Sequence, residues 1–261
     1  MKAIIIPNLE KEGAANILAK VRIALAENNI EYNISESLDN LSGIDIIITI
    51  GGDGTIIHAA KAGAEHNIPI LGINAGRIGY LANISPHELS LLSALNKGTY
   101  ETEERMLLEV TLGDQKYYCL NEAVISKGSL SRMIDIKLSV DGCPISYRAD
   151  GLIAATPTGS TAYSMSAGGP VVDPSLGLFL ITPICSNSLF DRPIILSENS
   201  VLEVLTECPQ NTEAYLTIDG EKSIKIMPQQ ALTIKKAPYT AKLIKIKNSS
   251  FYETLSEKMR G

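Results

Sequence analysis

The residues with the clearest capacity for chemistry form a glycine-rich segment around an acid, Gly51-Gly52-Asp53-Gly54-Thr55. It lies between an apolar stretch and an expected helix. Glycines in such a turn let backbone N–H groups approach an anion, and a helix start adds partial positive charge. The segment therefore predicts a phosphate-binding turn beside a carboxylate, as in a kinase. Asp-Gly is also an ordinary turn dipeptide, so this segment alone leaves a purely structural role open.

Three further segments combine polar residues with glycines: 74–81, the pair Asn121-Glu122, and 148–163. The first follows a predicted strand, where ligands bind in open α/β sheets. The pair has apolar neighbours on both sides, and burying it without partners is costly. Residues 156–163 carry five side-chain hydroxyls, which suit a polar, planar ligand. A surface kink at the pair and a plain loop at 156–163 are the structural alternatives.

In kind, order and spacing these segments resemble the NAD kinase family. The matching motifs are GGDGT at 51–55, N-x-G-x-x-G-Y-L at 74–81, Asn-Glu at 121–122, DGLIAATPTGSTAY at 150–163 and SAGGP at 166–170. The resemblance covers nearly the whole chain, and the long motif is highly specific. It implies that ATP phosphorylates the 2′-hydroxyl of the adenosine ribose of NAD to give NADP, with both nucleotides as substrates.

The resemblance also implies roles for individual residues. Asp53 is expected near the attacking hydroxyl, as general base or as an orienting contact, with Mg²⁺ carried by ATP close to it. Gly51, Gly52 and Gly54 shape the turn that faces phosphate, and ATP is expected to meet this turn and the region 168–169. The residues expected to bind NAD are Asn74, Asn121, Glu122, Asp150, Thr161, Ala162, Tyr163 and Ser166.

Two of the expected contacts have ordinary alternatives. Arg148 could neutralise pyrophosphate, including across a subunit interface, or form a simple ion pair. Tyr163 could stack on the ligand or be a core aromatic residue with a satisfied hydroxyl. Two positions depart from the family pattern: Ser186-Asn187 stand where many members carry Pro-His, and Glu221 stands where many carry Gln.

Two other functions stay open. A lipid or sugar kinase could use the same GGDGT turn, but it would leave Asn121 and Glu122 without a role. A regulator could bind NAD(P) without turnover, although an intact Asp53 argues against it. The chain has no Walker A sequence, and no strand is followed by G-x-G-x-x-G, so a P-loop ATPase and an ordinary Rossmann dehydrogenase are disfavoured.

Composition predicts a folded globular protein. The 261 residues are 45% hydrophobic and 20% charged, and a net charge of −6 disfavours binding to nucleic acid or anionic membranes. Four cysteines without a C-x-x-C pair and only three histidines make a zinc site unexpected. Free thiols indicate the cytoplasm, and no apolar run is long enough to cross a membrane.

Hydrophobic periodicity predicts two domains. Strands and helices alternate over residues 1–98, which favours a parallel sheet flanked by helices. Period-two alternation and Asp-Gly hairpin turns over 99–241 favour an all-β, sandwich-like domain. The tail, 242–261, is expected to return to the first domain with a strand and a helix capped by Ser250.

Some expected elements lie close to the candidate residues. A helix is expected from Ser85 to Leu95, starting at a capping box. One strand is expected over 117–125, and separate strands over 232–234 and 243–247. The resemblance implies a homo-oligomer, dimer or tetramer, and the exposed hairpin edges of the second domain are its expected interface.

Overall fold

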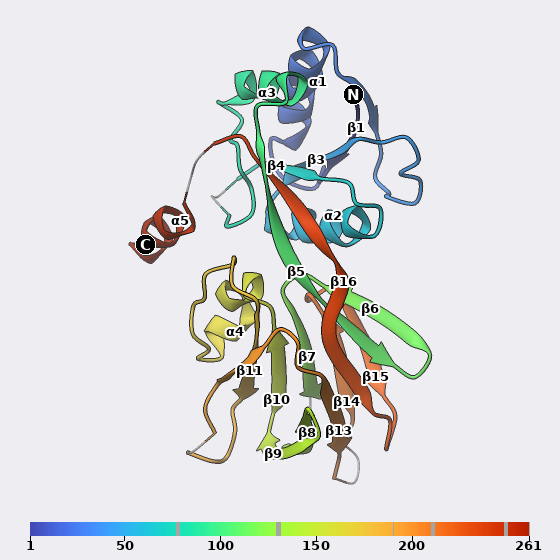
Figure 1. Cartoon of the computed structure of the whole chain (residues 1–261), viewed down its shortest axis with the longest axis vertical. Helices are drawn as coiled ribbons and strands as arrows, with labels where there is room; N and C mark the ends of the chain where they lie inside the picture. The colour runs from blue at the N-terminus through green and yellow to red at the C-terminus, as the bar shows by residue number, and fades with distance from the viewer. Residues whose placement is uncertain (77–78, 129–131, 190, 210–211, 248–249, 261) are drawn as a thin grey trace. The chain divides into compact units, whose positions relative to one another are not determined.

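The computed structural model describes residues 1–260 except 77–78, 129–131, 190, 210–211 and 248–249 (Figure 1). It contains two compact units, Met1–Arg105 with Tyr239–Gly261, and Met106–Pro238. Strands β5 (Glu101–Leu112) and β16 (Leu232–Lys245) contribute residues to both units. Within the described part of the chain, no helix combines the length and apolar character needed to span a bilayer.

The first unit is built on a parallel sheet, as predicted. Its strand order is β2–β1–β3–β4, and the C-terminal part of β16 joins β4 in parallel through Leu243 and Ile70. The strands are β1 (Lys2–Pro7), β2 (Glu31–Ile34), β3 (Ile46–Gly51) and β4 (Ile70–Asn74). Both β3 and β4 are buried along their whole length, as expected for parallel strands covered on two faces.

Helices cover the two faces of this sheet (Figure 1). Helix α1 (Ala14–Glu27) packs on a cluster that includes Leu71 and Ile73 of β4. Helix α2 (Asp53–Glu65) lies on the other face, because a Cβ added to Gly72 would be 2.4 Å from Ile56 Cδ1. Glycine at 72 therefore allows α2 to approach β4 closely.

The helix expected from Ser85 begins later. Residues 86–87 form a turn, and the helical part comprises η1 (Leu89–Leu92) and α3 (Ser93–Lys97). Ser85 donates its N–H and its hydroxyl to the carboxylate of Glu88, at 2.9 and 2.8 Å, and Lys247 Nζ donates to the same carboxylate at 2.6 Å. The Ser85 hydroxyl therefore binds a side chain instead of capping a backbone amide, and the predicted start was wrong.

The capping box predicted at Ser250 is confirmed. Helix α5 (Phe251–Met259) follows it, and Ser250 Oγ accepts a hydrogen bond from Glu253 N at 3.1 Å. In return, Ser250 N donates to Glu253 Oε2 at 2.9 Å.

The second unit consists mainly of antiparallel strands in two sheets, as predicted. One sheet joins β16, β13, β8 and β9 in that order, with β5 and β6 beside β16, and the other has the order β12–β11–β10–β7–β14–β15. Two short helices, η2 (Thr158–Thr161) and α4 (Tyr163–Ser166), follow β10. The remaining strands are β6 (Gln115–Cys119), β7 (Glu122–Lys127), β8 (Ile134–Val140), β9 (Cys143–Ala149), β10 (Gly151–Ala155), β11 (Leu178–Ile184), β12 (Ile194–Ser197), β13 (Leu202–Glu207), β14 (Ala214–Ile218) and β15 (Lys222–Ile226).

Alternation along the strands builds the core between these sheets. Ile134, Ile136 and Leu138 of β8 join Phe179 and Ile181 of β11 in one buried cluster. The opposite face of the second sheet is also buried, because Ile153, Ala155 and Leu180 pack with Val172. Strand β10 is therefore covered on both faces, partly by the segment that follows it.

Two strand predictions were wrong in their boundaries. The single strand expected over 117–125 is two strands: β6 pairs with β5 in the first sheet, and β7 pairs with β10 and β14 in the second. The chain changes sheets at Leu120-Asn121, so the predicted functional pair lies at the crossing. Conversely, the strands expected at 232–234 and 243–247 are parts of one long strand, β16.

Burial in the second unit predicts a contrast between two isoleucines on neighbouring strands. Ile181 is fully buried, whereas Ile195 is 56% exposed. Ile181→Ala should lower the free energy of unfolding by about 2–5 kcal/mol because it leaves a cavity, and Ile195→Ala by less than about 1 kcal/mol. Denaturant unfolding of both variants measures the difference, and equal losses would contradict this packing.

Candidate functional site

Asp53 lies where β3 ends and α2 begins, as the glycine-rich motif predicts. The preceding turn needs glycine at one point, because a Cβ on Gly51 would be 2.2 Å from Thr55 Oγ1. Asp53 occupies the first turn of α2, where negative charge is favourable and backbone N–H groups lack helical partners. The motif therefore places a carboxylate at a helix start, a position whose backbone N–H groups are suited to an anion.

The carboxylate of Asp53 also binds the second glycine-rich segment. Its Oδ2 accepts from Tyr80 N at 2.8 Å, and its Oδ1 accepts from Leu81 N at 3.2 Å. A Cβ on Gly79 would lie 1.9 Å from Oδ1, so this close approach requires glycine. The two motifs thus meet at one carboxylate. Arg77 and Ile78 of the second motif lie outside the described residues.

Asn74 lies at the same edge of the sheet. It is paired with Gly51 in the β3–β4 register, and Ala75 N donates to Gly51 O at 2.9 Å. Its side-chain oxygen accepts from Gly76 N at 3.0 Å, so Asn74 shapes the loop that follows β4. The structure therefore brings Asn74 to the GGDGT turn.

Lys11 is a candidate that sequence reasoning missed. Its Nζ lies 3.1 Å from the position that a Cβ on Gly52 would occupy. The lysine follows β1, whose carboxyl end lies at the same edge as that of β3 because the strands are parallel. A cation in the loop after the first strand was the available signal, and it supplies positive charge beside a turn suited to phosphate.

In the second unit, Asn121 and Glu122 are held by an acid that the motifs did not predict. The carboxylate of Asp219 accepts hydrogen bonds from the backbone N–H groups of Leu120, Asn121 and Glu122, at 2.9, 2.8 and 3.0 Å. Asp219 N donates to Glu122 O at 3.0 Å. The available signal was the Asp219-Gly220 dipeptide, although by itself it predicts only a hairpin turn.

The long motif at 150–163 packs against the other side of this pair. Thr156 N donates to Asn121 O at 2.9 Å, and the Thr156 hydroxyl donates to Leu120 O. A Cβ on Gly159 would be 2.1 Å from Asn121 O. Glycine at 159 is therefore required for the 150–163 motif to pack against Asn121-Glu122.

The hydroxyls of this motif divide into two groups. Those of Thr156 and Ser160 are fully buried, and Ser160 Oγ accepts from Val172 N at 3.0 Å. The expectation that they form a ligand surface was wrong, since they hold the loop together. Tyr163 is 44% exposed, so the core alternative for it does not apply, and Ser166 of the following motif is also exposed. Thr161 and Ala162 are partly exposed.

Glu122 is the most electrostatically perturbed of the predicted residues. Burial raises the pKa of its carboxyl to about 7, and the neighbouring Asp219 charge adds to this, whereas the Tyr163 backbone N–H opposes it. Within the described structure, its buried Oε2 has no hydrogen-bond partner. Glu122 is therefore poised to exchange a proton, or to accept a hydrogen bond, near neutral pH.

Asp150 and Arg148 both have partners within the second unit. Lys127 Nζ is 2.7 Å from Asp150 Oδ1, which balances that charge. Arg148 Nη1 is 4.0 Å from Asp135 Oδ1, and its side chain is 56% exposed, so this is a loose ion pair. Asn187, one of the departures from the motif pattern, donates its N–H to Arg148 O at 3.1 Å.

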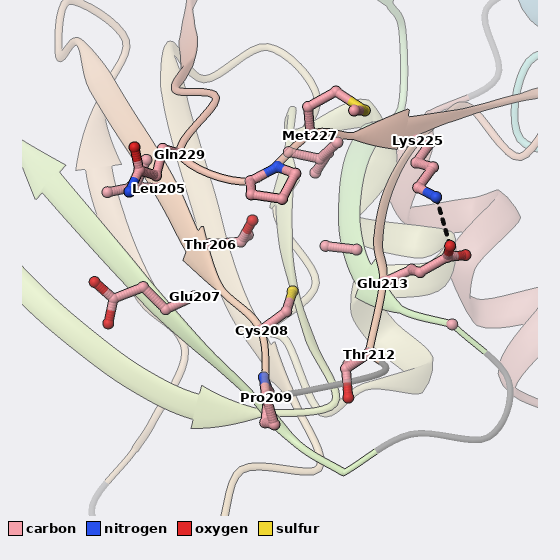
Figure 2. Close-up of a pocket in the computed structure, with 14 residues that line it drawn as sticks. Leu205, Thr206, Glu207, Cys208, Pro209, Thr212, Glu213, Lys225, Met227 and Gln229 are labelled. Carbon is pink, nitrogen blue, oxygen red and sulfur yellow. Dashed lines mark hydrogen bonds and ion pairs between the residues drawn. The ribbon is translucent and has the colours of Figure 1, made fainter.

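A cavity of about 950 Å³ lies elsewhere in this unit, by β13, β14 and β15 (Figure 2). Thr206, Cys208 and Met227 are among its lining residues, and Lys225 pairs with Glu213 at its side. None of the motif residues that the structure describes is among those lining it. Among the residues described, no three His, Cys, Asp or Glu side chains gather as a metal site.

Comparison with known proteins identifies relatives along the whole chain. The ATP-NAD kinase N-terminal domain matches residues 4–100, and the ATP-NAD kinase C-terminal domain matches residues 120–246. The NAD kinase of Carboxydothermus hydrogenoformans is 40% identical over 259 residues, covering 97% of this chain and 92% of the relative. That of Natranaerobius thermophilus is 37% identical over 280 residues, covering 98% and 97%.

Solved structures agree with these matches. An NAD kinase from Archaeoglobus fulgidus in complex with ATP has a TM-score of 0.82 and 31% identity, covering 100% of this chain and 99% of that one. A yeast NADH kinase complexed with NADH has a TM-score of 0.89 and covers 100% and 87%, but at 21% identity it supports the fold alone.

The raised pKa of Glu122 predicts a specific pH dependence of stability. The folded state keeps this proton between pH 4.5, the ordinary value, and about 7, whereas the unfolded chain releases it. The contribution to stability is therefore present below pH 4.5 and is lost as pH rises to about 7.

Relative to Glu122→Gln, the parent should lose roughly 3 kcal/mol of unfolding free energy across that window. Urea unfolding at several pH values measures this, with Glu203→Gln, an exposed glutamate on β13, as control. If the free energy of unfolding changed with pH equally in the parent and in Glu122→Gln, Glu122 would have an ordinary pKa.

Proposed function

This chain belongs to the ATP-NAD kinase family, and we propose that its transfer of phosphate from ATP to the 2′-hydroxyl of the adenosine ribose of NAD depends on Asp53. The enzyme is an NAD kinase that produces NADP. The observation that carries the role of Asp53 is its position, a carboxylate at the start of α2 directly after a glycine turn.

The proposed chemistry follows from this position. The 2′-oxygen bonds to the γ-phosphorus while the bond from that phosphorus to the oxygen retained by ADP breaks, and the hydroxyl proton leaves toward the Asp53 carboxylate. Such transfers depend on positioning and charge neutralisation more than on covalent participation of the protein. Each oxygen of Asp53 accepts one amide and keeps further acceptor capacity for the hydroxyl.

Magnesium fits this site as a companion of the nucleotide. Mg²⁺ usually keeps several waters and binds one or two carboxylates together with substrate phosphates. Asp53 supplies one carboxylate at the turn, and no cluster of three ligand side chains is found in the described part of the chain. Bound with ATP, the ion would neutralise phosphate charge, and Lys11 would add a second cation beside Gly52.

NAD is proposed to bind residues of the long motifs. Asn121 and Glu122 are the central pair, because their backbone is fixed on both sides while the Glu122 carboxyl keeps an unpaired oxygen within the described structure. The other proposed contacts are Asn74, Asp150, Thr161, Ala162, Tyr163 and Ser166. Arg148 stays a proposed pyrophosphate contact, since its guanidinium is exposed and only loosely paired.

Location and assembly are further proposals. We propose a cytoplasmic enzyme, supported by four cysteines that are all free thiols. We also propose a homo-oligomer, a dimer or tetramer, with the interface on the β-rich unit, because β9, β12 and β15 are edge strands of its sheets.

Removing the proposed base should nearly abolish turnover. Asp53→Ala is expected to lower kcat by about 100- to 10,000-fold, the usual range for loss of a general acid or base. The assay supplies ATP, Mg²⁺ and NAD and follows NADP with an NADP-specific dehydrogenase. Asp39→Asn, at an exposed aspartate of the same unit, is the control. If the kcat of Asp53→Ala stayed within a few-fold of that of the parent, Asp53 would have no part in the mechanism. If the parent bound NAD but formed no NADP, the protein would be a regulator.

The lysine beside the glycine turn should affect ATP more than NAD. Lys11→Ala is expected to raise the KM for ATP by about 3- to 10-fold, since a partly solvated charge contact contributes about 1 kcal/mol. Lys20→Ala, on the exposed side of α1, is the control. Initial rates at varied ATP and at varied NAD separate the two effects, and an equal change in both KM values would argue against a phosphate contact.

A further inference from the structure

Asp219 occupies an unusual backbone position. It lies in the turn between β14 and β15 with φ of 47°, followed by Gly220 with φ of 71°. Aspartate tolerates this left-handed conformation better than most residues, and Asp-Gly is a favoured hairpin turn. Glu221 N donates to Ile218 O at 2.9 Å and closes the turn. The turn alone, however, does not require a carboxylate that accepts hydrogen bonds from another segment.

The carboxylate of Asp219 supplies hydrogen-bond acceptors where the chain crosses from one sheet to the other. The chain leaves β6 of one sheet at Cys119 and enters β7 of the other at Glu122. Backbone N–H groups at such a crossing lie outside the strand pairing of both sheets. Burying an N–H group without a hydrogen-bond partner lowers the stability of the fold. Asp219 accepts the N–H groups of Leu120, Asn121 and Glu122 at 2.8–3.0 Å.

The carbonyl groups of the same residues are held from the other side. Thr156 binds Leu120 O and Asn121 O, and Asp219 N binds Glu122 O. The backbone of the pair is therefore fixed by two segments that are remote in sequence, the loop after β10 and the turn after β14. The Asp219 contacts, unlike those of Thr156, bring a negative charge to the pair.

We propose that Asp219 is a positioning residue for NAD phosphorylation, which fixes the backbone of Asn121 and Glu122 so that their side chains meet the dinucleotide. This inference rests on the proposed assignment of Asn121 and Glu122 as NAD contacts. Asp219 acts through the pair and takes no part in the reaction itself. The motif pair is thus functional only together with the β14–β15 turn.

The charge of Asp219 affects the pKa of Glu122, which a residue that only shaped the turn would not do. Burial and, after it, the charge of Asp219 raise the pKa of the Glu122 carboxyl. The opposing contact is the Tyr163 N–H. Neutralising Asp219 should therefore lower the pKa of Glu122, and any pH dependence of NAD affinity that follows Glu122 should move to lower pH.

The test replaces the carboxylate while keeping the left-handed backbone. Asp219→Asn retains the size and tolerates the same φ, but its amide group cannot accept from three N–H groups. We expect the KM for NAD to rise by about 10-fold or more, because the hydrogen bonds to the pair lose the charge of their acceptor and the new NH₂ group meets a third backbone N–H, while the KM for ATP changes little. The pH midpoint of NAD affinity, measured by calorimetry without ATP, should fall.

The chain contains a matched control for this substitution. Asp141 also precedes a glycine in a hairpin turn, with φ of 49°, and its Oδ1 accepts from Val201 N at 2.8 Å. Asp141 lies in the turn between β8 and β9, and it binds Val201 through both its backbone N–H and its side chain. Asp141→Asn should therefore leave the KM for NAD within about two-fold of the parent. A similar rise for both variants would overturn the proposal, because it would reflect general loosening of the β-rich unit.

A parallel variant separates this inference from the function on which it rests. Asn121→Ala should weaken NAD binding if the pair contacts NAD. If Asn121→Ala weakens binding and Asp219→Asn does not, the positioning role is wrong and the site assignment stands. If neither weakens binding, the assignment of the pair fails first, and the inference falls with it.

Folding of the variants is checked by thermal unfolding. Asp219→Gly provides a second test, because glycine adopts the left-handed turn most easily and also removes the carboxylate. It should reproduce the rise in the KM for NAD. If neither variant folds while Asp141→Asn does, Asp219 serves the fold as a whole, and a role confined to positioning the pair is overturned.

Discussion

One carboxylate, that of Asp219, accepts hydrogen bonds from three consecutive backbone amides where the chain passes between sheets. Strand pairing cannot satisfy these amides, because β6 has ended and β7 has only begun. Water would satisfy them in an exposed loop, but Leu120 is fully buried there. This interaction therefore holds the crossing and the backbone of Asn121-Glu122, against which the 150–163 motif packs, since buried backbone groups need partners.

Asp53 shows a related use of a carboxylate in the first unit. It binds the amides of Tyr80 and Leu81, and it lies at a helix start suited to phosphate. The same acid therefore fixes a loop and is the proposed base of phosphoryl transfer. A side chain whose rotamer is held by backbone donors is already oriented before the substrate arrives, which lowers the entropic cost of reaching the reactive geometry.

Glu122 illustrates how such positioning changes chemistry. Its burial is the larger cause of its raised pKa, and the charge of Asp219 is the second. The interaction that fixes its backbone therefore also makes its ionisation less favourable. Buried acids with an unpaired oxygen are costly in a folded chain and are concentrated at sites that use them. The Oε2 atom of Glu122 has no partner in the described part of the chain, which leaves it available to a ligand.

The sequence by itself determined the two kinds of unit, the family and the segments that carry chemistry, because periodicity, glycine turns and linear motifs are local properties. Tertiary structure alone decided the break between β6 and β7, the continuity of β16 and the late start of the helix after Ser85, since each depends on partners remote in sequence. It also divided the hydroxyls of 156–163 into buried and exposed groups, and brought Lys11 to Gly52. Asp219 is the clearest case: its sequence predicts only a turn, and its hydrogen bonds to residues 120–122 exist only once both sheets have formed.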